Sequence, residues 1–321
     1  MTDSPRVVAL GGGHGLAASL SALRQVTDEL TAVVTVADNG GSSGRLRREL
    51  GVLPPGDLRM ALAALCRDDE WGRTWANVLQ HRFTSQGDLD DHAVGNLLIV
   101  ALWELLGEAV EGLDWVARLL GAEGRVLPMS AVPLDITAHV LGLDPDHPEA
   151  ITEVRGQAEV ATTTGRVIDV ALDPADPPAC PEALEAIAEA DWVVVGPGSW
   201  FTSVIPNLLV PELARGLQET KARRLVTLNL GGQKGETDGF SPETHLEVLA
   251  AHAPDLRIDV VLADSRHVPD QASLRRTAES LGADLVIADI ADDSTELHHD
   301  PAKLAKLYRE LCGTRRRREG L

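Results

Sequence analysis

Short runs of β-branched and aliphatic residues alternate along this chain with longer stretches of helical periodicity. The first run, RVVAL at 6–10, leads into a glycine-rich turn, and LAASLSALRQV then keeps helical periodicity as far as Thr27. The next apolar run, at 31–38, follows a crossover long enough to place it parallel to the first. The pattern predicts a βαβ unit whose second strand ends at Asp38.

The middle of the chain changes character twice. Between residues 40 and 125 a strong strand pattern is lacking, and helical stretches follow Asp57, Trp71, Val94 and Glu108, with breaks at RRELGVLPPGD and TSQGDLDD. Between 126 and 172 the runs VLPMS, DITAHVLG, TEVRGQAEV and RVIDVAL alternate and are separated by Gly, Pro and Asp turns. We predict a helical excursion at 40–125 and a small, mostly antiparallel β-rich insertion at 126–172.

Strand and helix patterns alternate again beyond the insertion. Three pairs begin at DWVVVGPGS, RRLVTLNL and IDVVLADS, and DLVIADIA with PAKLAKLYRELC supplies a last strand and helix. Alternating units of this kind favour a parallel sheet with helices on both faces. The expected fold class is α/β, with one Rossmann-like domain over residues 1–321 built on a doubly wound, mostly parallel sheet.

Composition limits the classes of partner that the protein is expected to bind and the cellular compartment in which it is expected to lie. The chain has 49 Asp and Glu residues against 29 Lys and Arg, and its net charge of -20 opposes binding to nucleic acid or anionic lipid. The arginine run at 315–318 is interpreted as a solvated terminus. CxxC spacing, a positively charged leader and an apolar run of about 18 residues are all lacking. We expect a cytoplasmic protein without membrane insertion, disulfide or structural metal.

The glycine turn after the first strand fits G-x-G-x-x-A from Gly13 to Ala18. Small residues there let a diphosphate approach the amides at the N-terminus of the next helix, and we favour this over a purely structural turn. His14 would lie beside the phosphate, where a contact role is favoured over acid catalysis. Asp38 would then accept hydrogen bonds from a ribose, as in NAD proteins, so an NAD-binding oxidoreductase stays an open alternative.

The segment after Asp38, NGGSSG at 39–44, is rich in amide and hydroxyl donors and as a whole indicates an anion site. For Ser42 or Ser43 alone, capping of the following RLRREL helix is an equally good interpretation. GGSSG also matches G-x-S-x-G, which would make Ser42 a hydrolase nucleophile served by Asp264 and His298. We interpret that match as accidental, because a turn dipeptide separates Ser42 from its strand.

Two more glycine-rich turns follow strands later in the chain. GPGS at 196–199 comes directly after DWVVV, so its amides form a second candidate phosphate site, and a rigid turn with Ser199 as helix cap is the alternative. LGGQKGET at 230–237 follows VTLNL and offers Lys234 to a phosphate, although it is not a Walker loop and a solvated lysine is the more usual outcome.

Six blocks of the chain, in order, resemble the gluconeogenesis-factor (YvcK-like) family. They are VALGGGHGLAASLSALR, VTVADNGGSSGRLRREL, LPPGDLRMALAAL, HAVGNLLIVAL, GPGSWFTSVIPNLLV and GQKGETDGFSPETHL. The resemblance implies a Rossmann-like fold shared with the 2-phospho-L-lactate transferases of the CofD-like superfamily. It also implies binding of UDP-sugars, including UDP-N-acetylglucosamine and UDP-glucose, and a regulatory role in cell shape and envelope precursor supply during gluconeogenic growth.

The transferases of that superfamily carry a Cys-Pro-Ser-Asn-Pro type loop where this chain has GPGS at 196–199. A phospholactate-transferase-like activity on a nucleotide-diphosphate donor is therefore the alternative, and the main expectation is a binding protein without a catalytic residue. The expected partners are a UDP-sugar, an unidentified regulatory protein and a second copy of the chain in a homodimer.

Mapped by motif, the resemblance implies a nucleotide-sugar pocket that needs no cofactor. Mg²⁺ would accompany a diphosphate only through Asp38 or Asp57. For Asp57 we favour N-capping of the LRMALAAL helix, and for Asn96 a cap or turn is the alternative to ligand contact. The implied ligand-binding residues are Gly12, Gly13, His14, Gly15, Asp38, Asn39, Gly40, Ser42, Ser43, Asp57, Asn96, Gly198, Ser199 and Asn229.

Overall fold

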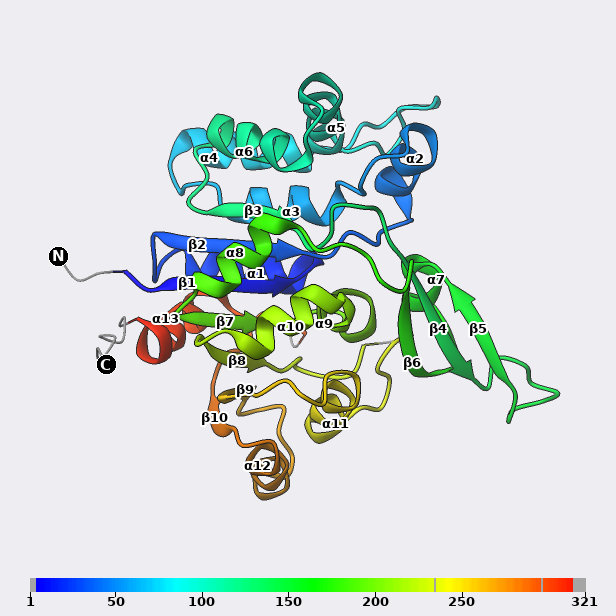
Figure 1. The fold of residues 1–321 in the computed structure, drawn as a ribbon, viewed down its shortest axis with the longest axis vertical. Coiled ribbons are helices and arrows are strands. Elements are labelled where there is room, and N and C mark those ends of the chain that lie inside the picture. Colours follow the sequence, from blue (N-terminus) through cyan, green and yellow to red (C-terminus); the bar gives the residue numbers. More distant parts are fainter. Residues whose placement is uncertain (1–3, 234, 296, 314–321) are drawn as a thin grey trace.

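A seven-stranded parallel sheet runs through the centre of the molecule in the order β10-β9-β8-β7-β1-β2-β3 (Figure 1). The computed structural model describes residues 4–233, 235–295 and 297–313. The strands of this sheet are β1 (Arg6–Gly11), β2 (Glu29–Val34), β3 (Arg125–Pro128), β7 (Trp192–Val195), β8 (Arg223–Thr227), β9 (Val260–Asp264) and β10 (Asp284–Ala288).

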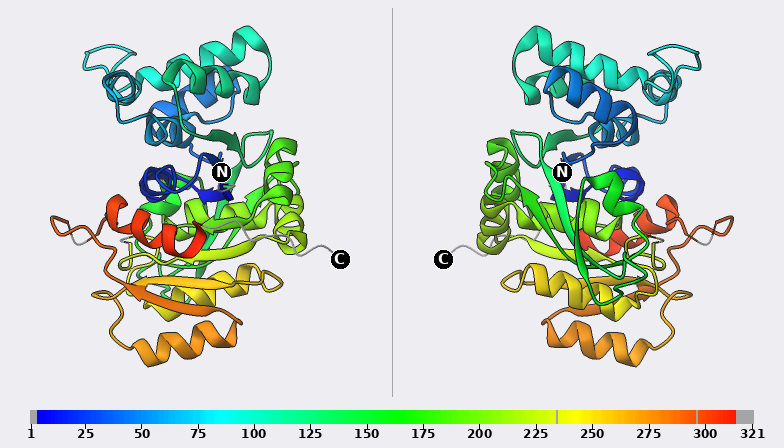
Figure 2. Two further views of the ribbon diagram at one scale, coloured as in Figure 1. Left: turned by 90° about the vertical axis from the view of Figure 1, so that its left-hand side faces the viewer. Right: turned by 90° about the vertical axis from the view of Figure 1, so that its right-hand side faces the viewer.

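The central strands are short apolar runs because helices cover both faces of the sheet. Residues 7–10 of β1 and all of β7 are buried, as expected for a parallel sheet. On one face α1 (Gly13–Leu23) packs against α3 (Gly56–Ala64) and α13 (Pro301–Cys312). On the opposite face lie α8 (Pro181–Glu189) and α10 (Pro211–Glu219), as Figure 2 shows. The doubly wound α/β fold predicted from the sequence is confirmed.

The order of the strands reverses beside β1. The chain passes from β1 outward to β2 and β3, and then returns to β7 on the other side of β1 before continuing to β8, β9 and β10. In doubly wound sheets the carboxyl ends of the strands at this reversal border the ligand crevice. The glycine turn at 11–15 follows β1 and the turn at 196–199 follows β7, so both turns lie at this position.

Five helices lie between β2 and β3 and form a lobe beyond that edge of the sheet (Figure 1). They are α2 (Gly41–Leu50), α3, α4 (Glu70–Gln80), α5 (Val94–Leu106) and α6 (Ala109–Leu120). The predicted break at RRELGVLPPGD is shorter than expected, because α2 continues to Leu50 and ends at Gly51 with φ of 68°. Glycine tolerates this left-handed conformation at a helix C-terminus.

The insertion is an antiparallel sheet that projects past the carboxyl edge of the main sheet (Figure 1). It consists of β4 (Asp135–Leu141), β5 (Ile151–Arg155) and β6 (Arg166–Asp173) in the order β5-β4-β6. Two predictions for this segment are wrong. The VLPMS run forms β3, which pairs with β2 in the main sheet, and the AEV part of TEVRGQAEV lies in the helix α7 (Gln157–Ala161) after Gly156 at φ of 108°.

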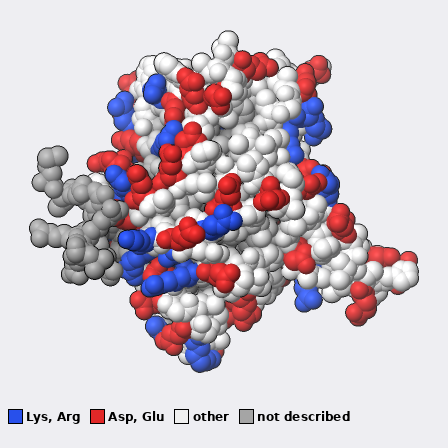
Figure 3. Space-filling view, in the orientation of Figure 1, with Lys and Arg blue, Asp and Glu red and all other residues white. Residues whose placement is uncertain are grey.

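The remaining helices follow β7, β8 and β9. A π-helical turn, η1 (Trp200–Val204), continues into α9 (Ile205–Leu209) after β7, while α11 (Pro242–His252) and α12 (Gln271–Ser280) precede β9 and β10. None of the helices in the described part of the chain has the length and apolar character needed to cross a membrane. On the face in Figure 3 acidic and basic side chains are interspersed. In the insertion, Arg155 forms ion pairs with both Asp135 and Asp173.

Candidate functional site

The two glycine turns at the strand reversal touch each other. A Cβ added to Gly15 would lie 2.3 Å from the carbonyl oxygen of Pro197 and 2.5 Å from the Cα of Gly198. A Cβ added to Gly198 would in turn lie 3.5 Å from the carbonyl oxygen of Gly12. The missing side chain at Gly15 therefore allows the loops after β1 and β7 to pack together. The two turns are therefore neighbours in space, although 180 residues of sequence separate them.

The N-terminus of α1 presents backbone amides to this region. Gly12 precedes the helix in an extended conformation, and no side chain caps it. The amides of Gly13, His14 and Gly15 are in the first turn, where they have no intrahelical acceptor, and the first helical bond runs from Leu16 to Gly12. Such amides and the helix dipole favour an anion. The side chain of His14 is exposed at this end of the helix.

Asp57 faces the glycine turn and does not cap its own helix, so the N-capping prediction is wrong. Helix α3 is preceded by Pro55 and has no side-chain cap. The Asp57 carboxylate instead accepts a hydrogen bond from the Gly13 amide. Its Oδ2 atom lies 2.4 Å from the position of a Cβ added to Gly12. The lack of a side chain at Gly12 therefore makes room for the carboxylate of Asp57 beside the α1 N-terminus.

A second carboxylate, that of Asp38, lies close to Asp57. Because β2 ends at Val34, Asp38 is four residues beyond the strand and does not end it as predicted. Its Oδ1 atom accepts a hydrogen bond from the Gly40 amide at 2.9 Å. Its Oδ2 atom is 3.0 Å from the position of a Cβ added to Gly56, directly before Asp57. Burial, and then the charge of Asp38, raise the pKa of Asp57 to about 7.

Ser43 belongs to the same group, whereas Ser42 points into the helical lobe. The Ser43 Oγ atom lies 2.4 Å from the position of a Cβ added to Gly56. Both serines are buried in the first turn of α2, and neither caps that helix, which follows Gly40. Of the two interpretations that the sequence left open for these serines, helix capping is therefore wrong.

The Ser42 hydroxyl joins α2 to α5. It accepts hydrogen bonds from the Ala93 amide at 3.3 Å and from Asn96 Nδ2 at 3.0 Å, and it lies 3.0 Å from His92 Nδ1. With two donors already on its oxygen, the Ser42 proton goes to His92 Nδ1. Burial lowers the pKa of His92, which favours this neutral acceptor form. Asn96 therefore positions Ser42, and its own Oδ1 is buried without a partner among the described residues.

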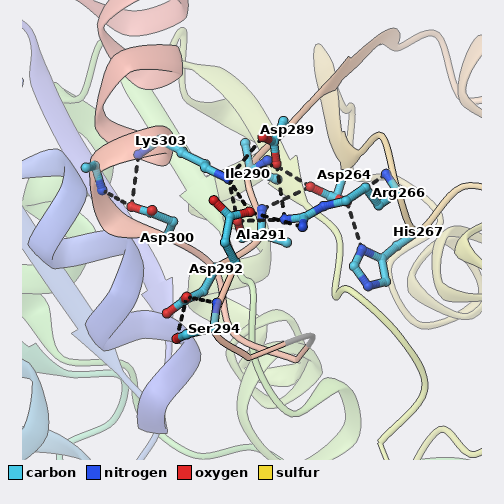
Figure 4. Close-up of polar contacts among 12 residues, drawn as sticks. Asp264, Arg266, His267, Asp289, Ile290, Ala291, Asp292, Ser294, Asp300 and Lys303 are labelled. Atoms are coloured by element: carbon cyan, nitrogen blue, oxygen red, sulfur yellow. Dashed lines mark hydrogen bonds and ion pairs between the residues drawn. The ribbon is translucent and has the colours of Figure 1, made fainter.

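The hydrolase triad suggested by G-x-S-x-G does not exist. Asp264 ends β9, which is separated from β2 by three strands of the sheet. Both of its oxygens are occupied (Figure 4): Oδ1 accepts from the Arg266 amide and His267 Nδ1, and Oδ2 accepts from the amides of Ile290 and Ala291. His298 is exposed and contacts Thr295. Asp264 therefore holds the loops after β9 and β10 together.

Asn39 connects the loop after β2 to the insertion. Its Oδ1 atom accepts a hydrogen bond from the Ala158 amide at 3.0 Å, and its Nδ2 atom donates to Glu159 Oε2 at 2.7 Å. Gln157, one residue before Ala158, donates from Nε2 to the carbonyl of Thr202 in η1 at 2.8 Å. The short helix α7 thus bridges the loops that follow β2 and β7. The sequence contained no signal for these contacts.

The second glycine turn has its amides engaged by side chains of the chain itself. The Gly198 amide donates to Asn229 Oδ1 at 3.0 Å, and Asn229 Nδ2 donates back to the Gly198 carbonyl at 2.8 Å. The Phe201 amide donates to Glu236 Oε2 at 3.1 Å, and the Thr202 hydroxyl donates to Glu236 Oε1. Ser199 also donates to Glu236. A carboxylate of the protein therefore takes the place at the start of η1 where the sequence suggested a phosphate.

Glu236 was missed by the sequence reasoning, which had considered Lys234 from the same loop; Lys234 and residues 315–318 lie outside the described residues. Burial raises the pKa of Glu236, opposed by the hydrogen bonds from Thr202, Phe201 and Ser199. A carboxylate two residues after a lysine in a glycine-rich loop is too common a pattern to single out. Its function depends on η1, which is more than thirty residues away in the sequence.

Replacing Glu236 with alanine should lower the free energy of unfolding by about 3 kcal/mol, because the buried Phe201 amide and Thr202 hydroxyl lose their acceptor. Denaturant unfolding of Glu236→Ala measures this loss. The matched control is Glu247→Ala, an exposed change on α11 expected to stay within about 0.5 kcal/mol of wild type. Equal unfolding midpoints for Glu236→Ala and wild type would contradict a capping role for Glu236.

Three polar side chains that the sequence did not single out form a hydrogen-bond network next to the first glycine turn. The Thr35 hydroxyl donates to the Ser203 carbonyl at 2.7 Å, and Asn207 Nδ2 donates to Thr35 and to Ser203 at 2.8 and 2.9 Å. The Ser203 Oγ atom lies 3.2 Å from the position of a Cβ added to Gly12. This network ties the end of β2 to η1 beneath the first glycine turn.

The carboxylates beside the α1 amides decide whether this region could hold a metal ion. Within the described residues there is no group of three or more His, Cys, Asp or Glu side chains arranged to hold a metal. Asp38 and Asp57 form a pair of carboxylates beside the amides of α1. Mg²⁺ commonly uses one or two carboxylates together with water and substrate phosphates. The pair therefore fits a cation that arrives with a phosphorylated ligand.

Comparisons with known proteins agree over nearly the whole chain. A family model described as 2-phospho-L-lactate transferase CofD matches residues 7–307. A putative gluconeogenesis factor of Mycobacterium tuberculosis is 55% identical over 315 residues, covering 97% of this chain and 91% of the relative. A gluconeogenesis factor of Listeria monocytogenes is 36% identical over 312 residues, covering 94% of each. A crystal structure of a Bacillus halodurans protein of the upf0052 family has a TM-score of 0.84 and 31% identity, covering 96% of this chain and 99% of that chain.

Proposed function

We propose a function for this chain, which belongs to the CofD family and within it to the gluconeogenesis factors. The chain binds a nucleotide sugar at the strand reversal and acts as a regulatory protein. The ligand would be a UDP-sugar such as UDP-N-acetylglucosamine. Its diphosphate would lie against the first-turn amides of α1. The observation that carries the proposal is the meeting of two strand-end glycine turns beside these amides.

The electrostatics of the crevice support a diphosphate in spite of the acidic composition. The Asp57 pKa of about 7 means that this carboxyl is substantially protonated at neutral pH. A protonated carboxyl donates a hydrogen bond to an anion, whereas a carboxylate repels it. If Mg²⁺ accompanies the ligand, Asp57 would instead be ionised, and the cation held between Asp38, Asp57 and the phosphates would neutralise their negative charges. Asp38 would also accept hydrogen bonds from ribose or sugar hydroxyls.

The regulatory part of the proposal is supported by the way α7 is attached. Asn39 and Gln157 connect the insertion to the loops after β2 and β7, which border the crevice. A ligand that draws these loops together would shift the insertion, and a partner protein would detect that shift. We place the proposed role in cell shape and envelope precursor supply during gluconeogenic growth in such a contact. The candidate partners are an unidentified regulatory protein and a second copy of the chain, in a cytoplasmic setting.

A second function, transfer of a phospho group from a nucleotide-diphosphate donor, has two observations in its favour. The matching family model is named for a phospholactate transferase, and the Asp38–Asp57 pair resembles the acidic groups that hold Mg²⁺ on a phosphate donor. Sustained turnover of a nucleotide donor in the presence of an acceptor and Mg²⁺ would favour this function over a binding role.

Asp38→Ala is the variant that tests the proposed site. Loss of the hydrogen bonds between the Asp38 carboxylate and the ligand should weaken the binding of UDP-N-acetylglucosamine at least tenfold. The protein should still fold, because within the described part of the structure the Asp38 side chain accepts a hydrogen bond only from the nearby Gly40 amide. Calorimetric titration with UDP-N-acetylglucosamine, GDP and NAD, with and without Mg²⁺, measures the affinities.

The control is Asp88→Ala, an exposed change in the lobe that should leave affinity unchanged. Unchanged affinity in Asp38→Ala would move the ligand away from this loop. Selective binding of GDP would point to the transferase function, and selective binding of NAD would point to an oxidoreductase.

A further inference from the structure

A cavity of about 500 Å³ lies between the insertion and the loop that follows β8. One wall is residues 161–166, which run from the end of α7 into β6, and the other includes Gly235, Glu236, Asp238 and Phe240. No residue of the glycine turns at 11–15 and 196–199 lines it, so it is separate from the amides of α1. Its volume is in the range of small-molecule pockets.

The lining combines a flat ring with hydroxyl groups. Phe240 contributes an aromatic side chain to the lining, and three consecutive threonines, 162–164, contribute hydroxyl-bearing side chains, of which Thr162 donates to the Ala158 carbonyl. Thr163 is 8% exposed, and its Oγ1 atom has no hydrogen-bond partner among the described residues. Buried hydroxyls usually have a partner. Thr162 and Thr164, on either side of Thr163, are exposed, and a ligand with hydroxyl groups of its own would hydrogen-bond to them while stacking an apolar face on the ring.

The charges around the cavity disfavour an anion. Glu236 and Asp238 are both acidic, and Arg166 is the one basic residue in the described lining. The oxygens of Glu236 already accept from Phe201 and Thr202, so its carboxylate is held in place. Asp238 is exposed and offers acceptor oxygens. A neutral molecule with several hydroxyls and one apolar face, which is the chemistry of a pyranose ring, fits these features better than a phosphate or a carboxylate does.

The cavity is joined to the nucleotide crevice by residues in direct contact. Glu236, in its wall, binds the Thr202 hydroxyl in η1. The next residue, Ser203, lies against Gly12 of the first glycine turn. The α7 helix, whose first residue contacts Thr202, ends at Ala161 in the cavity wall. The cavity and the diphosphate site would therefore be connected through η1, which contacts Glu236, and through α7, which ends in the cavity wall.

We infer that this cavity binds a neutral pyranose and so sets the sugar preference of the protein. The inference rests on the proposed nucleotide-sugar function only if the sugar is part of the bound nucleotide sugar. The pyranose would be either the sugar end of the bound nucleotide sugar or a separate sugar molecule that binds beside the nucleotide. Phe240 would stack on the ring, and Asp238 and the threonine hydroxyls would hydrogen-bond to its hydroxyls.

The experiment compares Phe240→Ala with wild type for three ligands: UDP, UDP-N-acetylglucosamine and free N-acetylglucosamine. If the nucleotide sugar reaches the cavity, wild type should bind UDP-N-acetylglucosamine about tenfold tighter than UDP, and Phe240→Ala should remove this advantage without weakening UDP. If the sugar is separate, the two nucleotides should bind equally. Free N-acetylglucosamine should then give a saturation-transfer NMR signal that Phe240→Ala abolishes.

Two further variants separate binding from folding, because Phe240 also contacts Phe201 and His245. Phe240→Tyr keeps the ring and should restore the wild-type preference. Asp238→Ala changes an exposed side chain and should weaken sugar binding several-fold, whereas Asp146→Ala, an equally exposed aspartate in the insertion, should not.

The measurements distinguish an error in the nucleotide-sugar proposal from an error in the pyranose-pocket proposal. If UDP and UDP-N-acetylglucosamine both fail to bind wild type, the nucleotide-sugar function is wrong, and the pocket is still tested by free N-acetylglucosamine. If Phe240→Ala and Asp238→Ala leave both the nucleotide-sugar preference and the free-sugar signal as in wild type, the pyranose pocket is overturned whatever the glycine turns bind.

Discussion

Gly15→Ala is expected to destabilise the protein by about 3 kcal/mol and to abolish nucleotide binding. An alanine Cβ would lie 2.3 Å from the Pro197 carbonyl oxygen and 2.5 Å from the Gly198 Cα, which are backbone atoms of a buried turn and cannot rotate away. Overpacking of this kind separates the elements involved. Here it would push the N-terminus of α1 away from β7, so the first-turn amides would no longer face the crevice. Denaturant unfolding and calorimetry measure the two effects.

The matched control for Gly15→Ala is Gly87→Ala. A Cβ at Gly87 meets no other atom within 4 Å, and this glycine does not have a positive φ that would strain alanine. Its stability should stay within about 0.5 kcal/mol of wild type. If Gly15→Ala unfolds at the wild-type midpoint, the close contact between the two glycine turns is not a feature of the protein in solution.

Asp57→Asn is expected to stabilise the protein by roughly 2 to 4 kcal/mol at pH 8 and to change the pH dependence of stability. The pKa of Asp57 rises from 3.8 to about 7 on folding, because the side chain is buried and lies near Asp38. Between these two pH values the folded protein keeps a proton that the unfolded chain releases, so the stability of wild type falls as the pH rises from about 4 to about 7. Asparagine has no such charge and still offers an oxygen to the Gly13 amide.

Denaturant unfolding at several pH values between 4 and 8 tests this. The difference in unfolding free energy between Asp57→Asn and wild type should be small at pH 4 and grow until about pH 7. Asp88→Asn, at an exposed position, should parallel wild type at every pH. A variant less stable than wild type at pH 8 would show that the Asp57 carboxylate is stabilised in the folded protein, contrary to the direction of its pKa shift.

The fold could be predicted where local pattern and local conformation agree. The RVVAL run, the glycines that follow and the helical periodicity after them determine β1, the turn and α1, because each is specified by neighbouring residues. The prediction was wrong where strand pairing determines which sheet a segment joins. VLPMS reads as one more strand of an antiparallel group, yet β3 pairs in parallel with β2. Neighbouring side chains carry little information about which sheet an apolar run will join.

Some residues of the candidate site could likewise be predicted from the sequence, and the role of others needed the structure. The uncapped first-turn amides of α1 follow from a glycine turn that opens a helix, so the sequence was sufficient to locate them. The βαβ pattern added Asp38 to that region and the resemblance to the gluconeogenesis factors added Asp57, and in the structure the two carboxylates lie close together. Asn229 was also selected, but its hydrogen bonds to Gly198 give it a role in holding the second turn.

The sequence by itself determined the class of fold, the family and the position of the first glycine turn, because these depend on periodicity, on conformational preferences of single residues and on the order of motifs. Only the tertiary structure decided which side chains meet. Asn39 contacts a residue 119 positions away, and Glu236 caps a turn 35 positions before it. Such contacts arise because parallel strands bring distant loops to one edge of the sheet, and burial there requires each polar group to find a partner.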